Sequence, residues 1–569
     1  MEQRLLLAFV LMGLVLFLTP YFYKAPPPPA KTTTPAPASS QASPAPAGAP
    51  AVAKTAEAAP AAPATPVPGQ IVASTEQQFV VDTDIYHITL SNRGGTVRSW
   101  ILKKYHDKEG KPLELVNAAS NSKVAPPMSI VLRDDKAADA LNYGLYVAKP
   151  APDGLGIEYE FSDGKNYAKK TFQFSNSGGA HAYLSQIETE VTINGTPTDH
   201  LIQWRGGFGD ATVLNRVAEQ HAVYFDPHES GTLGLTQGKL TTKDAKSVKD
   251  GPVLTTGTYS FAGLDDRFFA AVFLPKDNTT VKVETIKDDV PPAPAGKEEM
   301  RVGVEVGGDS VNRFTLFVGP KDIDLLRRVD PKLQQMIDWG WYGVIAKPLF
   351  LAMHWVNDNF VHNYGWSIVL ITIAINLVLL PLRLKSMKSQ RKMQSLQPKL
   401  AAINAKYKGL SMRDPKKAEQ NQEVMDFYKK EGVNPMGGCL PMIIQLPLIY
   451  AFYKVLAVTI EMRGAHWLWI SDLSQPEQLP IHILPLVMIV SQFVIQKMTP
   501  NPGMDPSQAK MMMFMPLMFG FLFYNFSSGL VLYWLTSNLV GIAQQWAVNR
   551  MMPAPAAPPP PAALKKRGK

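Results

Sequence analysis

Long apolar segments dominate the C-terminal part of the chain. Two of them fill residues 511–548 and are joined only by Asn525–Gly529, which predicts a hairpin of two membrane-spanning helices. Three further apolar segments occur earlier, at 366–384, 436–456 and 481–495. The first of these is expected to begin near Pro348, so the pattern predicts a membrane core of five spans within residues 348–550.

A shorter apolar run, residues 5–18, follows Arg4 at the N-terminus. Counted together with interfacial residues as far as Tyr23, it approaches a full span, and no small-residue cleavage site directly follows it. We therefore expect residues 1–24 to form an N-terminal transmembrane anchor, with a cleaved signal peptide as the alternative. Residues 25–69 are rich in Pro and Ala and contain no aromatic residue, which is typical of an extended linker.

Polar and apolar residues alternate over parts of residues 70–328. The alternation is clear at 86–90 and at 157–161, and each run is followed by a turn rich in Gly, Asn or Asp. Further candidate strands lie at 182–193, 280–286, 300–306 and 312–318. Short strands separated by such turns predict an all-β domain built as a large sandwich.

The segment between the predicted sandwich and the first core span reads as a helix. Asp330 and Pro331 are typical of a helix start. Trp339, Trp341 and Tyr342 favour a position at the membrane surface, so we expect an interfacial amphipathic helix over 329–347.

Basic residues are concentrated between the first two core spans. Residues 385–432 carry twelve Lys or Arg and five Asp or Glu residues, and the tail at 551–569 is basic too. Because short basic loops stay in the cytoplasm, we expect both termini on the cytoplasmic side of the cell inner membrane. The β-domain is then expected on the other side, in a periplasm. A thin apolar stripe within the loop predicts a weakly held helical hairpin, with helices at about 385–408 and 415–431.

Composition agrees with a polar domain fused to a membrane domain. The mean hydropathy of −0.06 is too polar for a chain that lies entirely in a membrane. The net charge of +9 matters here through its placement in the loop and the tail. Cys439 is the one cysteine, which excludes an intrachain disulfide.

Motifs typical of enzymes are incomplete. The glycines at 206–211 lack the third glycine of a dinucleotide loop, and Gly238-Lys239 lacks the spacing of a phosphate loop. His228-Glu229 is not followed by a histidine at zinc spacing, and His354 is expected to be an interfacial side chain. We therefore expect no catalytic centre, no metal site and no cofactor.

Polar side chains inside the predicted spans carry more information. Asn376, Gln445, Asn538 and Gln544 lie at similar depths on three spans, in the inner leaflet. Amides can simply bind one another between helices, but four at one depth favour a hydrated groove, because each needs several partners in hydrocarbon. Lys454, near the outer end of its span, is expected to reach the interface.

Several stretches of the core resemble one family. Residues 434–447 are similar to the third-span signature of the YidC membrane protein insertases (the YidC/Oxa/Alb family), and 526–539 to their last hairpin. Leu396–Lys399 resembles the start of their cytoplasmic hairpin, and 467–474 resembles the outer loop after span three. The order of elements resembles that of Gram-negative members with a large periplasmic domain.

The resemblance implies a function. Members of this family act as insertases and chaperones for nascent inner-membrane proteins, alone or with the Sec translocon, through a hydrophilic groove that is closed on the outside. It also implies that the β-domain is a supersandwich that is largely dispensable for insertion. Ribosome and targeting-receptor contacts are implied for the cytoplasmic loops and tail, and membrane lipid is a further partner.

One position departs from the family pattern. Members usually carry an arginine inside the groove on the first core span, and the aligned residue here is Asn376. Arg383 lies just beyond it, at the expected cytoplasmic mouth. We therefore expect a hydrated groove lined by the four amides and helped by Arg383 or Lys454.

An apolar path for the client helix is expected beside the groove. Its candidate residues are Pro447, Phe452, Tyr533 and Trp534. Two other classes of function stay open on the residues alone, a small-solute transporter and an envelope scaffold. No internal repeat supports a transporter, and a scaffold would need no polar layer inside the membrane.

Overall fold

In the computed structural model, the described residues are 69–176, 178–212, 220–230, 237–276, 279–291, 297–340, 343–407, 416–433, 440–499, 514, 516–517, 520–521 and 523–551. They fall into two compact units. The first runs to Asp266 and resumes over Ala270–Gly319, and the second comprises Arg267–Phe269 and the residues from Pro320 onward. The expected anchor, nearly all of the expected linker, and the tail after Met551 lie outside the described residues.

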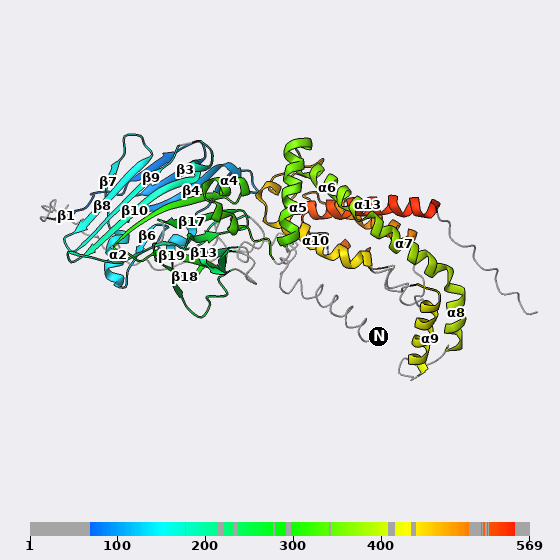
Figure 1. Ribbon diagram of the computed structural model, residues 1–569. Helices are drawn as coiled ribbons and strands as arrows, with labels where there is room; N and C mark the ends of the chain where they lie inside the picture. Colours follow the sequence, from blue (N-terminus) through cyan, green and yellow to red (C-terminus); the bar gives the residue numbers. More distant parts are fainter. Residues whose placement is uncertain are drawn as a thin grey trace, which may run out of the picture. The chain divides into compact units, whose positions relative to one another are not determined.

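The first unit is a β-rich sandwich of three antiparallel sheets (Figure 1). The strands of the largest sheet are β1 (Gln70–Ile71), β7 (Val147–Pro150), β8 (Gly156–Asp163), β9 (Asn166–Phe174), β10 (Leu184–Ile193), β11 (Thr196–Pro197), β13 (His221–Ser230), β14 (Gln237–Lys243), β16 (Phe261–Asp265), β17 (Phe269–Pro275) and β20 (Val311–Pro320). Their order in the sheet is β1-β8-β9-β10-β20-β17-β16-β13-β14. In addition, β7 pairs with β8 and β11 pairs with β10.

Two smaller sheets complete the sandwich. The five-stranded sheet has the order β15-β18-β19-β12-β6, with β15 (Val253–Gly257), β18 (Val281–Val290), β19 (Glu299–Gly307), β12 (Leu201–Trp204) and β6 (Ser129–Val131). The four-stranded sheet runs β2 (Gln78–Asp82), β3 (Tyr86–Ser91), β4 (Thr96–His106) and β5 (Pro112–Glu114).

Aromatic side chains form the core where the three sheets meet. The Trp100 ring of β4 lies edge-on to Phe174 of β9, with 5.8 Å between centroids, and 6.0 Å from Trp204 of β12. All three rings are buried. Burial of such large side chains is a main source of stability in a sandwich of this kind.

The candidate strands at 86–90, 157–161, 182–193, 280–286, 300–306 and 312–318 are confirmed as β3, β8, β10, β18, β19 and β20. The prediction of an all-β domain was incomplete, because one helix, α2 (Asp135–Tyr143), also lies in this unit. The Asp134 side chain accepts from the amides of Lys136 and Ala137 and so caps this helix. Two short 3₁₀ helices, η1 (Ala118–Ser122) and η2 (Gly179–Tyr183), connect strands.

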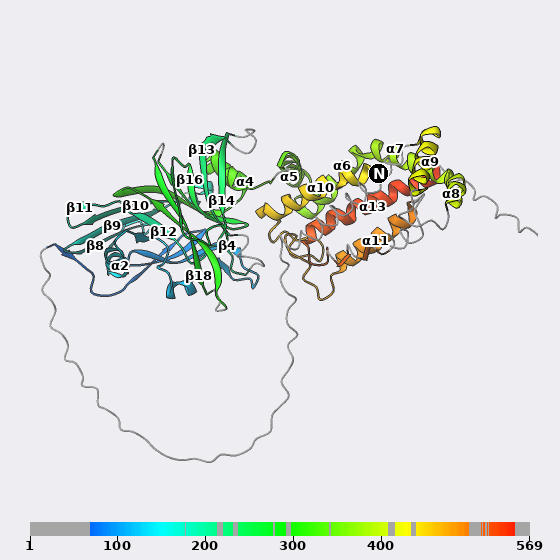
Figure 2. The same cartoon turned by 90° about the horizontal axis from the view of Figure 1, so that it is seen from below.

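The second unit is helical. Its elements are α4 (Ile323–Val329), η4 (Pro331–Met336), α5 (Gly343–Val356), η5 (Asn357–Val361), α6 (Tyr364–Val378), α7 (Leu380–Ser395), α8 (Gln397–Lys406), α9 (Lys416–Lys430), α10 (Leu440–Val458), η7 (Ile460–Met462), α11 (Ile483–Met498) and α13 (Ser528–Met551). Figure 2 shows α10, α13 and α11 side by side, and α6 also packs on α13.

No helix among the described residues is by itself both long and apolar enough to meet a simple test for a membrane span. The helical segments Gly343–Val361 and Tyr364–Val378 pass that test as a pair, with a bend of 116° between them.

Two expected helices are broken. The interfacial helix predicted over 329–347 is wrong as one element: Asp330 caps the short η4 instead, and a non-helical stretch follows before Trp341 and Tyr342, which lie outside the described residues. The first helix of the hairpin divides at Leu396 into α7 and α8, because Pro398 begins a new helix there.

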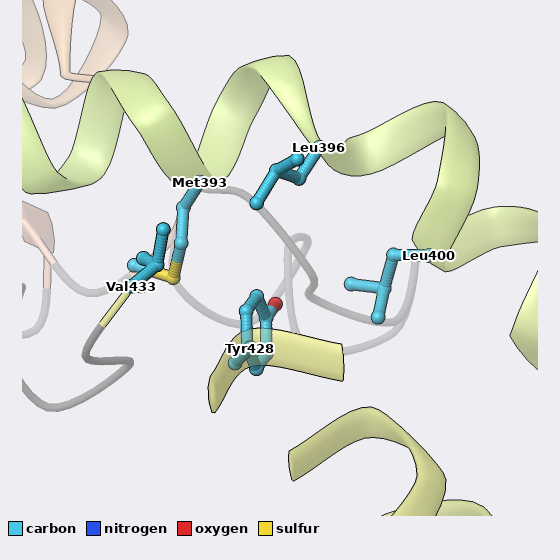
Figure 3. Close-up of a cluster of buried hydrophobic side chains, with 5 residues drawn as sticks. All are labelled: Met393, Leu396, Leu400, Tyr428 and Val433. Carbon is cyan, nitrogen blue, oxygen red and sulfur yellow. The ribbon is translucent and has the colours of Figure 1, made fainter. Parts of the chain in front are cut away.

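The hairpin of α8 and α9 is held by a small apolar cluster. Met393, Leu396 and Leu400 point toward Tyr428 and Val433, and all five side chains are buried (Figure 3). Val424 and Phe427 pack against this cluster and are partly buried.

Candidate functional site

Arg383 lies at the centre of a polar cluster between three helices. It sits near the start of α7, directly after Pro381-Leu382. Its guanidinium donates to the side-chain oxygen of Gln445 on α10 at 3.1 Å and to that of Gln544 on α13 at 3.3 Å. Among the described residues no carboxylate is paired with it. The cation is therefore held by neutral amide dipoles.

Asn376 borders this cluster from α6. Its side chain is buried, and its Nδ2 donates to the carbonyl of Thr372 in the preceding turn at 2.7 Å. The Gln544 Nε2 donates to the backbone oxygen of Asn376 at 3.3 Å. The Oδ1 of Asn376 is buried and has no hydrogen-bond partner in the described part of the chain. An unpaired buried acceptor is costly, so a hydrogen-bond donor would be stabilised at this atom.

Asn538 does not join the cluster. Its Nδ2 donates to the Oγ of Ser491 on α11 at 2.9 Å, and both side chains are buried. The structure thus brings together Asn376, Gln445, Gln544 and Arg383, and it separates Asn538 from them. The amides that were expected in a single layer thus belong to two separate contacts, one with Arg383 on α7 and one with Ser491 on α11.

Two of the four residues expected on the apolar path pack against each other. Phe452 of α10 and Tyr533 of α13 stack with 4.0 Å between ring centroids, and both rings are buried. The Tyr533 hydroxyl also accepts from Gln445 Nε2 at 2.7 Å, which links the stacked rings to the Arg383 cluster. The stacked rings are therefore not open to a client as the helices stand here.

The other two path residues are not part of this ring pair. Trp534 packs against Phe523, with centroids 4.6 Å apart, and its Nε1 donates to Gln492 at 3.4 Å. Pro447 lies inside α10 and is half-buried. Sequence reasoning missed Ser491 and Gln492, the polar partners on α11, because single Ser and Gln residues in an apolar helix give no distinctive pattern.

Lys454 does not contribute to the Arg383 cluster. Its Nζ lies 3.5 Å from an oxygen of Asp338, and its side chain is mostly buried. His354 contacts the Tyr364 hydroxyl at 2.9 Å and the carboxylates of Asp324 and Asp358 at 3.1 Å each. These contacts do not test the expectation that His354 is an interfacial side chain, which stays a prediction.

The glycine-rich segment at 206–211 is occupied by the protein itself. The Gly206 amide donates to Asp288 at 3.2 Å, and the Asp210 amide to Asp266 at 3.0 Å. Carboxylates held against these amides leave no place for a phosphate there. Among the described residues, no group of His, Cys, Asp and Glu side chains has the arrangement of a metal site.

Two family models match the chain. The model of the YidC periplasmic domain matches residues 78–352, and that of the 60Kd inner membrane protein matches residues 355–555. The membrane protein insertase YidC of Geotalea daltonii is 32% identical over 97% of this chain and 100% of its own length. The chain belongs to the YidC family of membrane protein insertases. The YidC of Cupriavidus necator is 35% identical, over 89% of this chain and 87% of its own length.

A solved structure of an active YidC insertase, with its first transmembrane domain resolved, covers 84% of this chain and 94% of its own. It is 20% identical, with a TM-score of 0.35, and the assignment to the YidC family rests on the sequence relatives. The chain is accordingly a membrane protein insertase and not an enzyme, with a β-rich periplasmic domain and a helical region typical of the YidC family.

Proposed function

We propose that this YidC-family chain inserts nascent membrane proteins by receiving the polar flank of the client at the Arg383 cluster. The observation that carries the proposal is a guanidinium bound by two amide oxygens with no carboxylate beside it in the described residues. A partly desolvated cation without a counter-ion gains from an anionic partner. A client carboxylate would act as this anionic partner, and it would dissociate from Arg383 again once the flank has crossed.

The energetic benefit comes from shortening the path through hydrocarbon. A polar flank with unsatisfied backbone groups costs several kcal/mol per group in lipid. Asn376, Gln445 and Gln544 would form hydrogen bonds to that flank in the inner leaflet, while Asn538 and Ser491 form a second polar contact between α13 and α11. The apolar client segment gains about 0.8 kcal/mol for each CH₂ that it buries in lipid, so no nucleotide is needed.

The topology that we propose has six spans, namely an anchor at 1–24 and five in the core at 348–550. Both termini, the hairpin at 385–432 and the tail at 551–569 lie in the cytoplasm, and residues 70–328 lie in the periplasm. The support is the excess of basic residues in the hairpin and the tail. These basic segments are the proposed contacts for the ribosome and the targeting receptor, and the Sec translocon is a proposed partner in the membrane.

Pro447, Phe452, Tyr533 and Trp534 form the proposed apolar path for the client helix. Because Phe452 and Tyr533 cover each other, a client would meet these rings only after α10 moves away from α13. Loss of the Gln445–Tyr533 hydrogen bond is part of the same movement. A carboxylate that arrives at Arg383 would compete with the side-chain oxygen of Gln445 for the guanidinium, and release of Gln445 would favour this opening.

The test is insertion of a single-span client into vesicles that contain only this protein. The client is made in two forms, with Asp or with Asn in its translocated flank. We expect Arg383→Gln to slow insertion of the Asp form about tenfold, since a hydrogen bond between charged groups contributes roughly 1.5–3 kcal/mol, and to affect the Asn form much less. Arg550→Gln, which removes an exposed arginine near the end of α13, is the matched control.

Equal insertion of both clients by wild type and Arg383→Gln would contradict the proposal. The same result for Arg550→Gln and Arg383→Gln would show that total charge matters and the Arg383 site does not.

A further inference from the structure

The loop between α10 and α11, residues 459–482, contains a tight hairpin with an apolar tip. Trp467 and Ile470 flank the tip, and each donates its backbone N–H to the carbonyl oxygen of the other at 2.8 Å. The two tip residues are Leu468, with 62% of its surface exposed, and Trp469, with 45% exposed. The flanking Trp467 and Ile470 are buried.

The backbone of Leu468 has a conformation that leucine rarely adopts. Its φ is +51°, in the left-handed region. At this place in a two-residue hairpin, glycine or asparagine satisfies the backbone better. Leu468 is therefore unfavourable at this turn in two ways, because its apolar side chain is exposed to solvent and its backbone has a conformation that leucine rarely adopts. Strain of this kind is typical of a functional constraint on the side chain.

The tip is held on a rigid base. The Trp467 indole lies so close to Gly365 that a Cβ on this glycine would be 2.2 Å from the ring, and it lies edge-on to Trp366 at 5.5 Å. The Glu477 carboxylate accepts from Trp469 Nε1 at 2.8 Å and from the amide of Leu484, in the first turn of α11, also at 2.8 Å. These contacts fix the tip relative to the starts of α6 and α11.

The chemistry of the tip fits a lipid surface. Its indole N–H is satisfied by Glu477 while the ring is exposed, as in the aromatic side chains that line membrane–water interfaces. Trp366, which contacts Trp467, is exposed as well and continues the apolar surface. Two side chains are far less than the roughly 800 Å² that each partner contributes to a stable protein interface.

We propose that Leu468 and Trp469 insert into the outer leaflet of the bilayer and set the depth of the α10–α11 loop. This inference rests on the proposed topology, in which the starts of α6, α11 and α13 and the end of α10 lie at the outer face. By fixing the outer ends of these helices, the tip would leave their inner ends, where Arg383 lies, free to separate around a client.

The test is a nitroxide spin label at position 468 of the full chain in phosphatidylethanolamine/phosphatidylglycerol vesicles. Leu468→Cys is made together with Cys439→Ser, since Cys439 is the one native cysteine. Gln478→Cys in the same background is the matched control, because Gln478 is an exposed polar residue of the same loop. We expect the ratio of oxygen to nickel-chelate accessibility to be several-fold higher at 468 than at 478.

Equal access of the nickel chelate to both labels would overturn the proposal, because the tip would then be in water. Exclusion of both oxygen and the chelate from position 468 would overturn it too, since protein rather than lipid would then cover the tip. Client insertion is measured with the same vesicles. Insertion that persists while position 468 reports water removes this proposal alone, whereas failure of the unlabelled wild-type chain to insert the client in these vesicles counts against the proposed function.

Discussion

The Arg383 guanidinium donates to Gln445 Oε1 at 3.1 Å, although the two residues lie 62 positions apart and on different helices. The other end of the same amide donates to Tyr533 at 2.7 Å. Gln445 thus links the charged centre of the proposed groove to the aromatic stack between α10 and α13. Its amide can serve both partners only in this one orientation, since Arg383 has no acceptor and needs the oxygen.

Replacing Gln445 should therefore affect insertion in a charge-dependent way. Gln445→Glu gives Arg383 a permanent carboxylate, so we expect slower insertion of a client with an acidic flank than in Gln445→Leu, which only removes the amide. The measurement is the insertion rate in vesicles for each variant and each client. A Gln445→Glu variant as fast as wild type would count against a role for the free charge of Arg383.

An Asn376→Leu, Gln445→Leu double variant with unchanged insertion would argue against any role of these amides in insertion.

The Phe452–Tyr533 stack should contribute strongly to the stability of the helical unit. Phe452 is fully buried, and Phe452→Ala leaves a cavity next to Tyr533, for which we expect a cost of about 3–5 kcal/mol. Tyr450→Ala is the control, because Tyr450 is an exposed aromatic residue on the same helix. Thermal unfolding in detergent should show a clearly lower midpoint for Phe452→Ala alone. Equal midpoints for the two variants would mean that the stack is not formed in solution.

Alternation revealed some strands and missed others for one physical reason. β3 has one covered face, so its polar and apolar residues alternate and the strand was predicted. β16 (Phe261–Asp265) is buried along its whole length, and β17 (Phe269–Pro275) is buried over its first five residues. A strand covered on both faces has no alternation to detect. The helix α2 was missed because its short apolar pattern lies among strand signals.

The site was predictable in composition but not in arrangement. Counting residues along each span placed the amides at one depth, but the direction in which each side chain points depends on how the helices are rotated. Asn538 faces α11 and Gln544 faces α7, and nothing local in the sequence distinguishes them. Arg383 was placed at the mouth because a charge after Pro381 suggests the end of a span. In the structure α7 begins after a single non-helical residue, Leu379, and its first turn carries the guanidinium to the amides.

Lys170 makes the stability of the β-domain depend on pH. Its side chain is fully buried, and its Nζ donates to the carbonyls of Gly94 and Met128, each at 2.6 Å, with no carboxylate paired to it in the described residues. Burial lowers the pKa of Lys170 from its ordinary value of 10.5 to about 7. Between these two values the unfolded state binds more protons than the folded state. Stability from this group therefore rises from pH 7 to pH 10.5, by up to about 1.4 kcal/mol per pH unit, and is lost as the pH falls toward 7.

Hydrogen exchange of β9 in the full chain measures this effect. Lys170→Met keeps most of the length of the side chain and removes the titrating group, and comparison at each pH cancels the intrinsic pH dependence of exchange. We expect the protection of β9 in wild type to increase relative to Lys170→Met as the pH rises above 7. A difference that stays constant from pH 7 to pH 10 would contradict the lowered pKa.

The hairpin of α8 and α9 should open independently of the core, and its apolar cluster rather than its ion pairs should control this opening. Leu400 is buried among Met393, Leu396 and Tyr428 (Figure 3), so Leu400→Ala should cost about 2–5 kcal/mol, a large loss for a cluster of five side chains. Lys406 pairs with Glu423 at 2.5 Å on the surface, where solvent screens the attraction, so Lys406→Ala should change little. We expect faster hydrogen exchange in α8 and α9 for Leu400→Ala only, with α11 and α13 unchanged in both variants. If Lys406→Ala opens the hairpin as much as Leu400→Ala does, charge pairing holds it, and its opening would then respond to salt.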